Sequence, residues 1–73
     1  MKISYDPETD ALYIKLIEGK HECRTARLNE EIALNIGLDE KLVGIEILDA
    51  TDVLGQGRLL DVTLENISQA VAV

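Results

Sequence analysis

The chain has 73 residues, which suffice for one domain (1–73) with a core so thin that dimerisation would help to complete it. It carries 14 acidic and 7 basic residues, a net charge of −7, and an acidic surface repels phosphate, which argues against a nucleic acid partner. Hydrophobic residues make up 47% of the chain without any Trp or Phe, so the core must be aliphatic.

The N-terminal segment predicts a β-hairpin. Residues 2–5 and 11–17 alternate between apolar and polar side chains, as strands with one buried face do. Between them, Pro7 presets φ for a type I turn, and Asp6 can accept a hydrogen bond from a backbone N–H two residues on. Asp10 follows where a left-handed residue is expected, a conformation that Asp tolerates with some strain.

A second hairpin is the clearest pattern in the chain. Residues 31–50 form two alternating apolar segments joined by a charged turn at 39–41. A weaker strand at 23–28 precedes them. We therefore predict five strands, each beside its sequence neighbour, in an antiparallel meander whose unpaired edges are the first strand and the fifth or a sixth.

The C-terminal part predicts helix. Residues 49–54 fit one helical turn that Gly55 and Gly57 would end. Residues 61–73 fit an amphipathic helix across the open apolar face of the sheet, although alternation at 59–64 leaves a sixth strand open. The predicted fold is therefore a small α+β domain, an antiparallel meander of about five strands with a C-terminal helix.

Three acids in the first turn have the spacing of a calcium loop. Asp6, Glu8 and Asp10 match its first ligand positions, but Ala11 and Ile17 stand where an EF-hand needs Gly and Glu. We interpret these acids as solvated turn residues.

Other candidate groups are equally incomplete. Glu46 and Asp49 could divide acid and base roles, yet on an exposed strand they would only keep an edge soluble, and Asp49 could cap the following helical turn. His21 and Cys23 are too few for a zinc site and lack the third group of a nucleophilic pair. Gly55–Arg58 lacks the remaining residues of a phosphate loop. We predict no catalytic residue, metal or cofactor, and hence no enzyme.

The cellular setting follows from what the sequence lacks. Cys23 is alone, so no disulfide forms within one chain, and a reducing compartment suits it. No leader pattern opens the chain, and no apolar run reaches the roughly 20 residues of a membrane span. We expect a soluble, cytoplasmic protein without a membrane partner.

Segments 5–8, 10–14 and 43–50, which read YDPE, DALYI and VGIEILDA, resemble the small bacterial and archaeal proteins grouped as domain of unknown function 2283. The resemblance covers about residues 1–50. At 35–41 the chain departs from the acidic strand and Asp-Gly turn usual in that family. The family has no settled activity. Its members are often encoded beside a small toxin-like protein, which implies an antitoxin-like role.

Two functional hypotheses follow. The first is a non-enzymatic acidic binding module that pairs with a small basic protein and forms a homodimer. Its contact residues would be exposed aromatic and acidic side chains, namely Tyr5, Tyr13, Glu46 and Asp49. The alternative is a metal-assisted hydrolase or small-ligand site that uses clustered acids, namely Asp6, Glu8, Asp10, Glu46 or Asp49.

Overall fold

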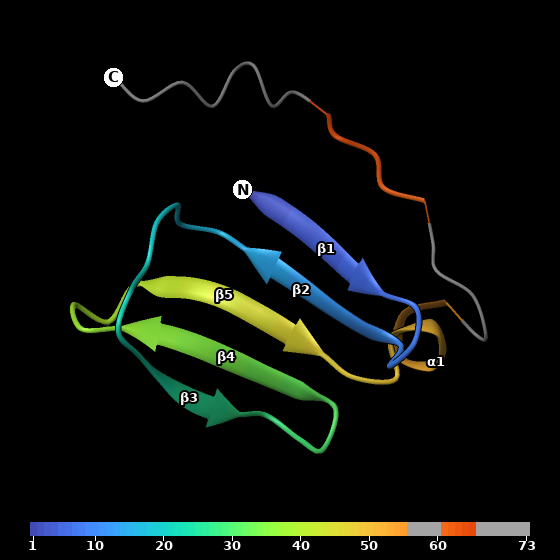
Figure 1. Cartoon of the computed structure of the whole chain (residues 1–73), viewed down its shortest axis with the longest axis horizontal. Helices are drawn as coiled ribbons and strands as arrows, with labels where there is room; N and C mark the ends of the chain where they lie inside the picture. The colour runs from blue at the N-terminus through green and yellow to red at the C-terminus, as the bar shows by residue number, and fades with distance from the viewer. Residues whose placement is uncertain (56–60, 66–73) are drawn as a thin grey trace.

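Five antiparallel strands and one short helix make up the part of the chain that this computed structural model describes, residues 1–55 and 61–65 (Figure 1). The elements in chain order are β1 (Lys2–Asp6), β2 (Ala11–Lys15), β3 (Cys23–Arg27), β4 (Ile32–Gly37), β5 (Leu42–Ile47) and α1 (Ala50–Gly55). The predicted α+β fold, an antiparallel meander sheet followed by a helix, is confirmed.

The strand order corrects one predicted adjacency. The order is β1-β2-β5-β4-β3, so β3, β4 and β5 form a meander while β2 lies beside β5 and not beside β3. The connection 16–22 has seven residues, longer than the two to five of common hairpin loops, and it spans the sheet end instead of closing a hairpin. Consequently β5 is central, and the edges are β1 and β3 rather than β1 and β5.

Both predicted turns are present, and the first has the local geometry that its sequence indicates. In the first, the Glu8 N–H donates to the Asp6 carboxylate at 2.9 Å, and Asp10 takes the expected left-handed backbone with φ 53°. In the second, the Gly37 N–H donates to the Lys41 carbonyl at 2.8 Å, and Glu40 is left-handed with φ 62°. These turns fix the register of the β1–β2 and β4–β5 pairs.

The two sides of the sheet differ in chemistry. We call the side that carries Ile3, Tyr5, Leu12, Ile14, Ile45 and Ile47 the apolar face. The opposite side, the polar face, carries Ser4, Tyr13, Lys15, Asn35, Gly44 and Glu46. Cross-strand partners share a face, so the register alone defines these two sets.

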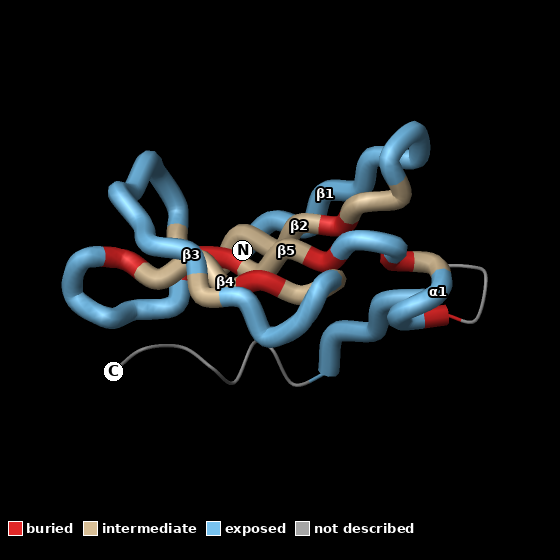
Figure 2. The backbone as a smooth tube through the Cα atoms, turned by 90° about the horizontal axis from the view of Figure 1, so that it is seen from below, coloured by how far each residue is buried: buried red, intermediate tan, exposed pale blue. Residues whose placement is uncertain are grey.

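The core is thin and lies between the apolar face and α1. Leu12, Ile47 and Ala50 form its buried cluster, and Ile14 and Ile45 pack against it. Figure 2 shows α1 below one end of the sheet, with buried residues along the middle strands and exposed ones on β1. Much of the apolar face is therefore only half-covered by the described residues.

The C-terminal predictions are settled in part. The helical turn predicted at 49–54 is confirmed by α1, which ends at Gly55. Residues 61–65 form neither the start of the predicted helix nor the alternative strand, so both predictions are wrong over those residues. The rest of the two predicted segments, 59–60 and 66–73, lies outside the described residues.

Candidate functional site

The four residues predicted to contact a partner do not form one surface. Tyr5 lies on the apolar face of β1, opposite Leu12. Tyr13 and Glu46 are direct cross-strand partners on the polar face. Asp49 follows β5 in an exposed, left-handed position with φ 52°. The structure thus brings together Tyr13 and Glu46 and separates both from Tyr5.

Tyr13 is anchored to its own sheet. Its ring lies over Gly44, where a Cβ atom would stand only 2.1 Å from the hydroxyl oxygen and 2.5 Å from Cζ. The Asn35 amide donates to the Tyr13 hydroxyl at 2.9 Å, and the Thr25 hydroxyl donates to the Asn35 amide oxygen at 3.4 Å. These contacts leave Tyr13 half-buried and link four adjacent strands. The side chain therefore has a structural role within its own sheet, which limits how much of it a partner can contact.

Asp10 connects three parts of the chain. Its carboxylate accepts hydrogen bonds from the Tyr5 hydroxyl at 2.8 Å and from the Thr51 hydroxyl at 2.7 Å. The Thr51 N–H lies 3.2 Å from Oδ1, and the Ala50 N–H donates to the Asp10 carbonyl at 2.9 Å. Asp10 therefore caps α1 from a distant turn, whereas Asp49, the predicted cap, accepts hydrogen bonds within residues 1–55 and 61–65 through its backbone carbonyl alone.

These hydrogen bonds also set the ionisation of the two side chains. The bonds from Thr51 and Tyr5 favour the charged carboxylate and lower the pKa of Asp10. The same bond to Asp10 favours the neutral phenol and raises the pKa of Tyr5. Sequence reasoning placed Asp10 in the turn but missed this capping role, because Thr51 lies 41 residues away.

The other predicted ligands stay apart. The Asp6 carboxylate accepts the Glu8 N–H, and within residues 1–55 and 61–65 no three His, Cys, Asp or Glu side chains are placed to hold a metal ion. The His21 ring bonds to the Glu18 carbonyl, and the Cys23 thiol donates to the His21 carbonyl at 3.4 Å. Both side chains are exposed and bond to backbone rather than to each other.

Charge is distributed unevenly between the two ends of the sheet. One end, which we call the acidic end, comprises the β1–β2 and β3–β4 turns, the last residues of β5 and α1, on the right in Figure 1. Counted over residues 1–55, eight acids and one basic residue, Arg27, lie in this half, a net charge of −7. The acids are Asp6, Glu8, Asp10, Glu30, Glu31, Glu46, Asp49 and Asp52.

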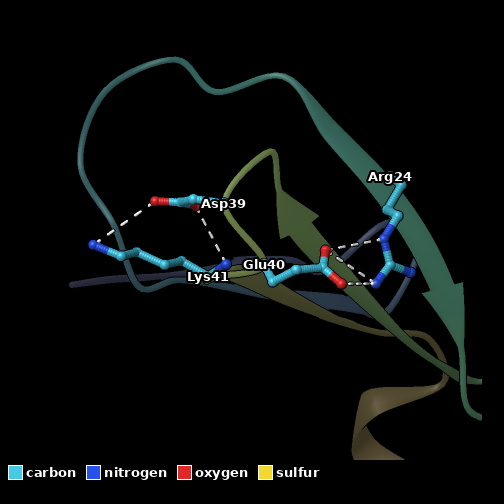
Figure 3. Close-up of polar contacts among 4 residues, drawn as sticks. All are labelled: Arg24, Asp39, Glu40 and Lys41. Carbon is cyan, nitrogen blue, oxygen red and sulfur yellow. Dashed lines mark hydrogen bonds and ion pairs between the residues drawn. The ribbon is translucent and has the colours of Figure 1, made fainter.

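The opposite end is nearly neutral and internally paired. Five Lys and Arg residues there face four acids, a net charge of +1. Figure 3 shows two of its ion pairs: Arg24 with Glu40 at 2.9 Å, and Lys41 with Asp39 at 3.7 Å. Every side-chain ion pair among the described residues lies at this end, so the carboxylates of the acidic end have no cation within 4 Å in that part of the chain.

The fold and these sites define a small α+β protein in which Asp6 and Asp10 have structural roles and most of the acids without an ion pair, among the described residues, lie at one end. The family model described as protein of unknown function (DUF2283) matches residues 2–50, and the chain belongs to that family. Comparison with curated proteins finds no match, and neither does comparison with solved structures. Among the described residues, no helix is long and apolar enough to cross a membrane.

Proposed function

We propose that the chain is a non-enzymatic binding module whose acidic end takes a small basic protein. The observation that carries the proposal is the separation of charge within residues 1–55: a net −7 at one end of the sheet and +1 at the other. A uniformly acidic surface would serve solubility alone. Because the excess negative charge is concentrated at one end, the electrostatic field of the molecule attracts a cationic partner to that end.

The acidic end presents exposed carboxylates that a partner could contact. Glu8 and Glu30 project from the two hairpin turns, and Asp52 from the first turn of α1, and all three residues are exposed. Their carboxylates accept no hydrogen bond within the described part of the chain. Such groups speed diffusional encounter with an opposite charge, and salt weakens that effect.

The proposal takes an antitoxin-like form in the cytoplasm, with the basic protein as cognate partner. It is favoured over acid–base or metal chemistry because Asp10, the central acid of the predicted cluster, already binds Tyr5 and Thr51. Asp6 likewise holds the first turn together. Both carboxylates therefore make structural hydrogen bonds that would be broken if they acted as catalytic or metal-binding groups.

The test is affinity capture followed by a direct binding measurement. The tagged full chain is expressed in its source cell, the co-eluting protein is identified by mass spectrometry, and its affinity is measured by calorimetry at several salt concentrations. We expect a stoichiometric basic protein whose affinity falls as salt rises. A neutral or acidic partner, or an affinity independent of salt, would contradict the proposal.

A pair of matched double variants locates the surface. Glu8→Gln with Glu30→Gln removes two charges from the acidic end, and Glu18→Gln with Glu22→Gln removes two from the opposite end. The first variant should bind the captured protein about tenfold more weakly, because rim charges contribute modestly to association, and the second should bind as the unmodified chain does. Equal losses of affinity in both double variants would show that the partner does not bind specifically at the acidic end.

A further inference from the structure

Strand β1 is an unprotected edge of the sheet. Among residues 1–55 and 61–65 it pairs only with β2, and against those residues all five of its own are exposed, including Ile3 at 44% and Tyr5 at 37%. An edge strand offers a row of free backbone N–H and C=O groups, and exposed apolar side chains add to its tendency to pair. The sheet is therefore open to another strand along β1.

We propose that β1 pairs with β1 of a second copy of this chain, antiparallel and about a two-fold axis through Ser4. The sequence of β1, Lys-Ile-Ser-Tyr-Asp, is complementary to itself in this register. Lys2 would lie opposite Asp6 of the second copy, and Ile3 opposite its Tyr5, with each pair formed twice. The two five-stranded sheets then join into one continuous sheet through an isologous contact.

Charge within one chain favours this register. Lys2 lies directly opposite Lys15 of β2 on the polar face, and like charges in that position destabilise a strand pair. In the dimer, Asp6 of the second copy would flank Lys2 on its other side and compensate that repulsion. Pro7 follows Asp6 and has no N–H to donate, so it ends the pairing after these five residues.

The apolar side chains fit the same arrangement. Ile3 and Tyr5 border a groove of about 340 Å³ on the apolar face, lined also by Leu12, Ile14, Leu54, Val62 and the acidic Asp61. Placing Ile3 beside Tyr5 of the second copy covers both exposed side chains and extends the apolar face across the joint. An aromatic side chain opposite a β-branched one is a favourable cross-strand pair.

The other edge is unsuited to self-pairing. Strand β3 carries Arg24 and Arg27 and no acid, so two copies in contact would bring cations together. Arg24 is already engaged with Glu40 at 2.9 Å. Joining β1 of one copy to β3 of another is a head-to-tail contact that leaves one β1 and one β3 unpaired, so it does not close into a dimer. Charge and closure therefore favour the pairing of β1 with β1.

Charge reversal tests the register directly. Sedimentation equilibrium of the full chain, at protein concentrations on the order of 100 µM because small interfaces are transient, should show a dimer. Lys2→Asp and Asp6→Lys each place like charges at both contacts and should each weaken the dimer about tenfold or more. Lys20→Asp and Glu8→Lys make the same charge changes away from β1 and should leave it unchanged.

Mixing the two β1 variants gives the decisive measurement. Each contact of the mixed pair joins a carboxylate of one variant to an ammonium of the other, so the mixture should dimerise more tightly than either variant does alone. Circular dichroism checks that each variant is folded, because Asp6 also accepts the Glu8 N–H. A monomeric unmodified chain, a dimer insensitive to both reversals, or a mixture of folded variants that stays monomeric would overturn the proposal.

Hydrogen exchange of the unmodified chain supplies a test that needs no variant. Amides of β1 should exchange more slowly at high than at low protein concentration, while those of β3 should not change. Protection of β1 that is independent of concentration would mean that another segment of the same chain covers this edge, and would likewise overturn the proposal.

Discussion

Asp10 and Thr51 stand 41 positions apart in the sequence and meet through the Thr51 hydroxyl, 2.7 Å from Oδ2, and the Thr51 N–H, 3.2 Å from Oδ1. The first hairpin turn thereby caps the helix that follows the last strand. This contact explains a carboxylate at φ 53°, where glycine would fit without strain. The cost of the left-handed backbone is offset by bonds that glycine cannot make.

Removing the hydroxyl of Thr51 should destabilise the fold. Thr51→Val keeps the shape of the side chain and deletes the donor to Asp10, so we expect Tm to fall by about 5 °C. Thr9→Val is the matched control, because Thr9 is exposed and its hydroxyl makes no hydrogen bond within the described residues. Thermal unfolding followed by circular dichroism measures both. Equal Tm changes in the two variants would show that the hydrogen bond from Thr51 to Asp10 does not contribute to stability.

The Asp10 carboxylate should make stability depend on acid pH. Its pKa is lowered in the folded state, mainly by the bonds from Thr51, so its contribution is present above the unfolded pKa of about 3.8 and is lost as pH falls through the folded pKa. Asp10→Asn keeps an acceptor and tolerates the left-handed backbone, but cannot ionise. The unmodified chain should therefore unfold at a higher temperature than the variant at pH 7, and the gap should close toward pH 2. A constant gap would contradict this account.

The two β-hairpins could be predicted because each is specified by residues that are close together in the sequence. The alternation within 31–50 and the turn residues Asp6 and Pro7 specify two hairpins without reference to the rest of the chain. The β2–β5 pair has no such signal, since it joins residues about 30 apart. One indication was present in the sequence: Leu42–Leu48 is almost continuously apolar, which is typical of a central strand, while the polar Cys23–Arg27 is typical of an edge.

The candidate site was less predictable than the fold. Tyr13 was expected to face outward, and it does lie on the polar face, but its engagement with Asn35 and Gly44 depends on the pairing of β2 with β5. The gathering of acids at one end follows from the alternation of strand direction, because an antiparallel meander of these five strands already brings Glu30 and Asp52 to the end that holds Glu8. Long-range pairing decides only which of these turns lie beside each other along that end.

The ion pair between Arg24 and Glu40 should contribute little to stability. The Arg24 guanidinium meets both carboxylate oxygens, at 2.9 and 3.2 Å, but the two side chains are 58% and 69% exposed. A double-mutant cycle with Arg24→Ala and Glu40→Ala should give a coupling energy of about 0.2–1 kcal/mol that falls with added salt. Urea unfolding at low and high salt measures it. A coupling well above this range, or one unaffected by salt, would show that more than an exposed ion pair joins β3 to the turn at Glu40.

A methyl group at Gly44 should be destabilising chiefly because the Tyr13 ring covers that position. Gly44→Ala puts a Cβ atom at a site 2.1 Å from the Tyr13 hydroxyl, and displacing the ring should cost about 1–3 kcal/mol. Tyr13→Ala alone also destabilises, because it removes the ring from the polar face. In the double variant, of the three atoms nearest to the Cβ position only the Ile14 carbonyl oxygen, at 3.1 Å, remains close, so Gly44→Ala should then cost clearly less than in the unmodified chain.

The cycle of these two changes, measured by urea unfolding, separates steric conflict from backbone preference. Gly44 has no positive φ and lies inside β5, so alanine suits its backbone dihedral angles, and the Tyr13 ring is the main steric obstacle to a Cβ atom there. A second variant, Tyr13→Phe, keeps the ring and removes the acceptor for the Asn35 amide, and should cost about 0.5–1.5 kcal/mol. If Gly44→Ala costs the same with and without the Tyr13 ring, the packing of Tyr13 on Gly44 cannot be what selects glycine in the central strand.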